Sequence, residues 1–248
     1  MNNSLKLGLD GASLKVERAY RHINEIKESI DDLGRLKPKQ ILERKQRDGS
    51  VILDIANLGE MGLALSLPIG DAIHNMRAAL DHVWNTLARE RNLTGFPTFP
   101  FHETRQNLID MVGKSPVANA FPETRRLIFD EIRPHRDCGG NELFWTITKL
   151  DKIDKHNLLV PTVEVTKVKK LKIRSGGRTL EIIDCTYSNF LHFGKFQGPV
   201  EYEGDIEIGF EIKFPEDNYL PGQPVISSLI EMAQATRNSV DLFRETFL

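Results

Sequence analysis

Apolar residues recur every three or four positions along several segments of the chain, which is the spacing of the buried face of an α-helix. The strongest case, opened by Pro68 and running from Ile69 to Arg91, has apolar intervals of 4, 3, 4, 3 and 4: Ile69, Ile73, Met76, Leu80, Val83 and Leu87. The same spacing predicts longer helices at 13–33, 143–156 and 225–247, and short ones at 103–112 and 122–132. Asn141 is the expected N-cap of the 143–156 helix.

After Pro161 the pattern changes to strict alternation of apolar and polar residues, which predicts strands with one buried face. The clearest strand has the apolar positions Ile206, Ile208, Phe210, Ile212 and Phe214. We expect an antiparallel sheet of about four strands within 159–222. Two β-like runs at 51–56 and 63–67, separated by a glycine-containing loop, predict a hairpin over 51–67. The stretch 40–47 reads as one or two further helical turns.

Taken together, these patterns predict a single α+β domain over 1–248. Residues 1–158 are expected to be mainly helical apart from the hairpin, and a helix over 223–248 is expected to return to this bundle after the sheet. The segment 96–101 is expected to be extended, because its prolines disfavour the helical conformation in the residues before them.

Composition narrows the function classes. The 248 residues include 33 Lys and Arg and 35 Asp and Glu, for a net charge of -2, which argues against a globally basic nucleic-acid binder. Two cysteines without a CxxC motif support neither a disulfide scaffold nor a cysteine-ligated zinc site. No signal peptide or membrane span is evident, so we expect a cytoplasmic protein.

The helix from Ile69 to Arg91 carries an unusual polar face. Placed at 100° per residue, its short polar side chains fall in a sector of about 140° opposite the apolar stripe; they include Asp71, His74, Arg77, Asp81, His82 and Asn85, with Asn75 beside them. A histidine can move a proton near neutral pH, while an arginine can stabilise charge developing on a phosphate. The alternative is a solvated face with pairs such as Arg77 and Asp81 four residues apart.

A second polar cluster, Asp151 to His156, ends another predicted helix. Helix capping explains it simply, because cations complement the C-terminal end of the helix dipole. Alternatively, Asp154 or His156 approaches the face around His82, and His74, His82, Asp154 and His156 hold a metal ion. His135, in a loop, is expected at the surface.

The basic residues Lys170, Lys172 and Arg174 lie on predicted strands and could contact phosphate. Their alternative role is to pair with the acidic residues of the neighbouring strand, among them Glu203, Asp205, Glu207 and Glu211. No common nucleotide-binding, zinc-protease or serine-hydrolase motif is present.

The block from Ile69 to His82, followed by Phe96-Pro97 and by Leu150 to His156, resembles a family of uncharacterised bacterial and phage-borne proteins. Arg77 and His82 are also similar to the Arg-x4-to-6-His motif of HEPN-type proteins, whose ribonuclease members cleave RNA without a metal, usually across a homodimer. In active members a polar residue commonly follows the arginine, where this chain has Ala78.

Three functions are therefore considered. The first is a HEPN-like, metal-independent endoribonuclease that serves in bacterial or phage conflict, with RNA as substrate. In it Arg77 binds phosphate, His82 is the acid/base, and Asp81, His74 and Asn75 orient them; Lys170, Lys172, Arg174, His156 and Asp154 line the substrate. The alternative is a non-catalytic homo-oligomeric or partner-binding module whose polar helix face is a buried network. The third is a metal-dependent hydrolase. We expect a homodimer, no cofactor, no membrane association, and an antitoxin or other protein as a further potential partner.

Overall fold

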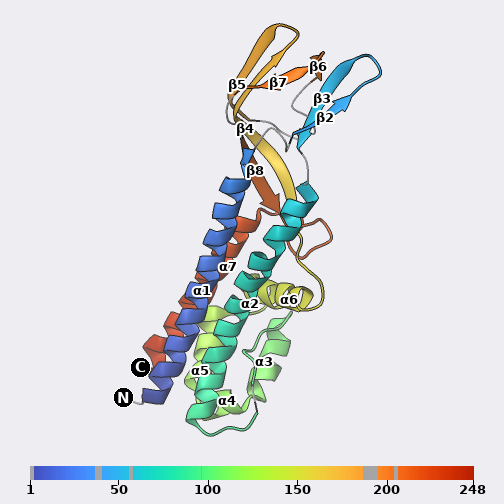
Figure 1. Ribbon diagram of the computed structural model, residues 1–248. Coiled ribbons are helices and arrows are strands. Elements are labelled where there is room, and N and C mark those ends of the chain that lie inside the picture. Colours follow the sequence, from blue (N-terminus) through green and yellow to red (C-terminus); the bar gives the residue numbers. More distant parts are fainter. Residues whose placement is uncertain (1–2, 37–40, 56–57, 96, 187–194, 204–205) are drawn as a thin grey trace. The chain divides into compact units, whose positions relative to one another are not determined.

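The computed structural model describes residues 3–36, 41–55, 58–95, 97–186, 195–203 and 206–248. The helices, coloured from blue to red along the chain in Figure 1, are α1 (Asn3–Leu33), α2 (Leu58–Glu90), α3 (Arg105–Gly113), α4 (Pro116–Ala120), α5 (Glu123–Arg126), the π-helix η2 (Leu127–Ile132), α6 (Glu142–Asp154) and α7 (Val225–Phe247). The strands are β1 (Arg35–Leu36), β2 (Ile41–Lys45), β3 (Ser50–Ile55), β4 (Thr162–Ser175), β5 (Arg178–Thr186), β6 (Lys195–Gln197), β7 (Val200–Tyr202) and β8 (Ile206–Lys213). The α+β class, the presence of a hairpin near the N-terminus and the sheet that precedes the last helix are confirmed.

The chain divides into two compact units. The helical unit comprises Met1–Asn24, Pro68–Leu159 and Ile226–Leu248, and the β unit comprises Glu25–Leu67 and Val160–Val225. Among the described residues, no helix combines the length and the apolar character that crossing a membrane requires.

The core of the helical unit joins segments that are far apart in sequence. Leu9 of α1, Val83 and Trp84 of α2, and Phe243 of α7 belong to one buried cluster. The Trp84 ring makes edge-to-face contacts with Phe99 and Phe243 at centroid distances of 5.9 and 6.3 Å. The last helix thus packs with the first two.

Asn141 caps α6 as expected, because its side chain accepts a hydrogen bond from the Leu143 amide. Residues 97–101 are extended between α2 and α3. Phe96, which belongs to the same predicted segment, lies outside the described residues.

The β unit contains more strands than the sequence predicted. A five-stranded antiparallel sheet has the order β1-β8-β4-β5, with β7 also paired to β4, and a second sheet has the order β2-β3-β6. Apolar side chains of both sheets, including Leu53, Val168, Leu171 and Ile208, form the core of this unit.

The prediction of a hairpin over 51–67 is wrong in its second strand. Residues 58–67 form the first turns of α2, where Met61 and Leu65 are buried, so α2 begins well before Pro68. The hairpin instead joins β2 to β3 through a turn in which Gly49 has a positive φ of 79°. Ile41–Lys45 is therefore a strand and not the helical continuation that the sequence suggested. Pairing with β3 decides this, and a short polar stretch read alone does not reveal it.

Candidate functional site

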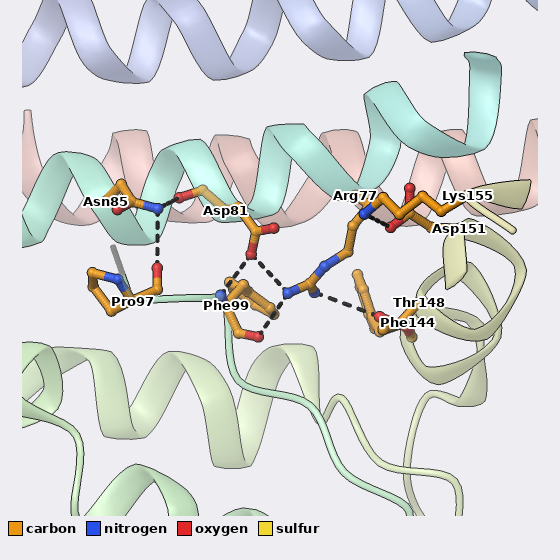
Figure 2. A network of polar contacts seen from close by, with 9 residues as sticks. All are labelled: Arg77, Asp81, Asn85, Pro97, Phe99, Phe144, Thr148, Asp151 and Lys155. Carbon is orange, nitrogen blue, oxygen red and sulfur yellow. Dashed lines mark hydrogen bonds and ion pairs between the residues drawn. The ribbon is translucent and has the colours of Figure 1, made fainter. Parts of the chain in front are cut away.

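One stripe of α2 faces α6 and the extended segment 97–101, and Figure 2 shows the polar contacts between them. The stripe contains His74, Arg77, Asp81 and Asn85 at helical spacing. Arg77 donates to Asp81 Oδ1 at 2.7 Å and to the carbonyl oxygen of Phe99 at 3.3 Å. Its other amino group lies 3.5 Å from Thr148 Oγ1 on α6. The guanidinium thus connects three segments of one chain.

Asp81 and Asn85 complete the attachment of the extended segment to α2. Asp81 Oδ1 accepts the Phe99 amide at 2.8 Å, and Asn85 Nδ2 donates to the carbonyl oxygens of Asp81 and Pro97 at 2.8 and 3.0 Å. A buried backbone outside regular secondary structure needs such partners for its N–H and C=O groups. We call Arg77, Asp81 and Asn85, together with Pro97 and Phe99, the clamp.

Arg77 is only 5% exposed, and burial of this kind disfavours the charged form of a side chain. Burial lowers the pKa of Arg77 and raises the pKa of Asp81, while the opposite charge of each residue counteracts the shift of the other. The Phe101 ring lies 4.9 Å from the guanidinium carbon. Because its amino groups are directed at protein groups and its face lies against an aromatic ring, the Arg77 guanidinium is poorly placed to bind a phosphate.

The other end of the stripe contains a histidine–aspartate pair. His74 Nδ1 lies 2.9 Å from Asp151 Oδ1, and Lys155 Nζ donates to Asp151 Oδ2 at 2.5 Å. The Asp151 side chain is 6% exposed and that of His74 is 51% exposed. In the tautomer with a proton on Nδ1, the imidazole is oriented by a buried carboxylate, and Nε2 is left as a proton acceptor.

Asp154 lies beside this pair. Burial, followed by the nearby carboxylates of Asp151 and Asp71, raises the pKa of Asp154, and His74 opposes the shift. Gly70 provides the space: a Cβ atom at Gly70 would overlap the Asp154 carboxyl group. α6 therefore does approach the polar face of α2, but near His74 and not near His82.

The structure does not bring Arg77 and His82 together. The side chain of His82 faces α1, where a Cβ atom on Gly11 would be 3.6 Å from Nδ1. Burial, and then the cations Lys15 and Arg89, lower the pKa of His82. Asn75 is buried and donates to the carbonyl oxygen of Asp71, and its Oδ1 finds no hydrogen-bond donor in the part of the chain that is described.

The other residues proposed from the sequence are dispersed. Lys172 and Arg174 both pair with Glu203, at 2.7 and 2.8 Å, and this carboxylate raises the pKa of Lys172. Lys170 is exposed and lies between Ile183 and Glu207 on the adjacent strands. His156 is exposed just beyond α6, and its side chain forms no hydrogen bond with another described residue. Asp205 lies outside the described residues.

No group of three or more His, Cys, Asp or Glu side chains in the described part of the chain could hold a metal ion. The set His74, His82, Asp154 and His156 is accordingly not assembled as the metal-hydrolase hypothesis requires. Cys138 is a free, exposed thiol.

Sequence reasoning missed two features of this region. Thr148 received no role, although it faces Arg77 from α6. His135 is buried and not at the surface, and its Nδ1 contacts Asp137 in the same loop. The spacing of Asp137 two positions after His135 could have indicated their contact. No local pattern indicated that His135 would be buried.

Comparison of the chain with family models, curated proteins and solved structures finds no match in any of the three. The resemblances described for Ile69–His82 and for the Arg-x4-His spacing therefore stay predictions.

Proposed function

We propose that the protein is a non-catalytic binding module in which the polar face of α2 is a structural network of the helical unit. The observation that carries this proposal is the environment of Arg77. Its guanidinium is buried and is bonded to Asp81, to the Phe99 carbonyl and, more weakly, to Thr148. Networks of this kind fix a unique packing arrangement when their members are satisfied.

Charge around the remaining polar groups supports the same proposal. Asp71, Asp151 and Asp154 lie around His74, and within the described part of the chain the one cation bonded to any of these carboxylates is Lys155. Such a surface repels a phosphate backbone. On the strands, Lys172 and Arg174 both pair with Glu203, whose single carboxylate offsets part of their positive charge.

The test measures stability and RNA cleavage on the same variants. Asp81→Asn keeps the shape of the side chain but removes the charge that faces Arg77, so we expect a loss of about 1–3 kcal/mol in unfolding free energy. Neither the wild-type protein nor this variant should cut RNA. If Asp81→Asn is as stable as the wild type, the network has no structural role and the proposal fails.

A second candidate is a metal-independent endoribonuclease in which His74, not His82, is the acid/base. The 2.9 Å contact between His74 Nδ1 and a buried Asp151 favours it, because this is how a general base is oriented. The decisive variant is His74→Gln, tested on single-stranded and structured RNA with His156→Gln as the matched control. Cleavage that His74→Gln abolishes and His156→Gln preserves would support this candidate, and intact RNA with the wild type excludes it.

A further inference from the structure

A groove on the helical unit runs beside α7. It has a volume of about 620 Å³, and its apolar lining includes Ile132, Leu143, Ile230, Ala235 and Leu242. Its α7 wall extends from Ile230 to Leu242, which spans about 18 Å at the rise of a helix. Ala235 and Ser239 are small, so another backbone can approach this wall closely.

The charge of the groove is of one sign. Glu131 and Glu231 are among its lining residues, and none of the lining residues is Lys, Arg or His. Glu131 pairs with Arg126, whereas Glu231 forms no ion pair with another described residue. A helix that enters this groove should therefore combine an apolar ridge with a cation near Glu231.

α1 presents a ridge with these properties. Leu7 is 73% exposed and Leu14 is 63% exposed, although both are large apolar residues. Arg18 and Arg21 are also exposed, and helical spacing places them on the same stripe as the two leucines. We call Leu7, Leu14, Arg18 and Arg21 the α1 ridge. It spans about 21 Å, close to the length of the groove wall.

We propose that the groove beside α7 binds the α1 ridge of a second copy of this chain. This inference rests on the proposed binding-module function and names its partner. The incoming α1 runs antiparallel to α7, so that its leucines cover the end of the groove near Leu242 and its arginines reach Glu231. Burying the two exposed leucines drives the association, and the charge pairs set its orientation.

A facing pair of α7 helices is a poorer arrangement. It would bring the carboxylates of one copy toward those of the other, and like charges that meet at an interface disfavour association. Single-stranded RNA is disfavoured on the same ground, because the groove lining carries no cation.

The test is sedimentation equilibrium of the full chain from about 1 to 100 µM. We expect self-association that is weakened at least tenfold by Leu14→Glu on the ridge and by Ala235→Arg in the groove. Met111→Glu is the matched control, because Met111 is an exposed apolar residue on α3 outside both surfaces. Circular dichroism establishes that each variant is folded.

Mixing the two defective variants gives the sharper result. Leu14→Glu retains an intact groove and Ala235→Arg retains an intact ridge, so their equimolar mixture should form a one-to-one complex that neither forms alone. The charge swap Arg21→Glu with Glu231→Arg should likewise restore association that each single change weakens.

A chain that stays monomeric at 100 µM overturns the inference, and so does association that is unaffected by these variants or a mixture that does not complement. The proposed function fails separately, through stable Asp81→Asn or through RNA cleavage. A monomer with an intact clamp would therefore contradict only the docking proposal.

Discussion

Replacing Arg77 with methionine tests the clamp at its centre. Methionine keeps an unbranched apolar side chain in the buried position but removes every donor. Of its side-chain hydrogen bonds to described residues, Asp81 would then keep the one from the Phe99 amide at 2.8 Å, and the Phe99 carbonyl would lose the Arg77 donor.

The expected cost follows from these contacts. A hydrogen bond between charged groups is worth about 1.5–3 kcal/mol and one to a neutral carbonyl about 0.5–1.5 kcal/mol. Breaking a fully buried ion pair costs about 3–5 kcal/mol. Asp81 is 28% exposed in its side chain, which reduces that penalty, and methionine adds apolar burial. We expect Arg77→Met to lower the free energy of unfolding by about 3 kcal/mol.

Urea unfolding followed by tryptophan fluorescence measures this change. The chain has two tryptophans, Trp84 and Trp145, and both lie in the helical unit, so the signal reports the unit that contains the clamp. Arg89→Met is the matched control, because Arg89 is exposed on the same helix and should change stability by less than about 0.5 kcal/mol. If the unfolding free energy of Arg77→Met lies within that same margin of the wild type, the clamp does not stabilise the helical unit.

Three further predictions concern packing, ionisation and capping. Gly8→Ala should destabilise the helical unit, because a Cβ atom there would overlap the buried Thr86 side chain; Thr86→Ser should recover part of the loss, whereas Gly113→Ala, with open space around it, should cause none. Folding raises the pKa of Asp154, so the folded state binds the proton more tightly and this contribution to stability declines as pH rises from the ordinary value of 3.8 through the raised value. Between pH 4 and 7, the free energy of unfolding should therefore decline less for Asp154→Asn than for the wild type. Asp241→Asn is the control, and equal slopes of unfolding free energy against pH for Asp154→Asn and the wild type would exclude the effect. Asn141→Ala should cost about 1 kcal/mol by thermal unfolding, and an unchanged midpoint would show that the cap is dispensable.

Local patterns predicted the helices and strands whose own sequence has a clear apolar period. The apolar intervals of Ile69–Leu87 identify most of α2, and the alternation from Ile206 to Phe214 identifies β8. The cap at Asn141 could also be predicted from the sequence, because an N-cap depends on a few adjacent residues.

Features decided by distant partners could not be predicted in this way. Ile41–Lys45 becomes a strand by pairing with β3, and residues 58–67 form a helix in which Met61 packs in the core of the β unit and Leu65 is also buried. The site follows the same rule. The helical period of α2 places Arg77 and His82 within one broad polar sector. In the structure, however, Arg77 bonds to α6 and to residues 97–101, whereas His82 lies beside α1. The separation of Arg77 from His82 depends on which helices pack against each side of α2, and the spacing of the motif does not predict that packing.

In the proposed function, the polar face of α2 builds structure and does not cleave RNA. The most direct test incubates wild-type protein, without added metal, with single-stranded and structured RNAs, beside His82→Ala and His74→Gln at equal concentration. We expect all RNAs to stay intact with all three proteins. Cleavage by the wild type that His82→Ala or His74→Gln abolishes, while the variant remains folded, would contradict the proposed non-catalytic function.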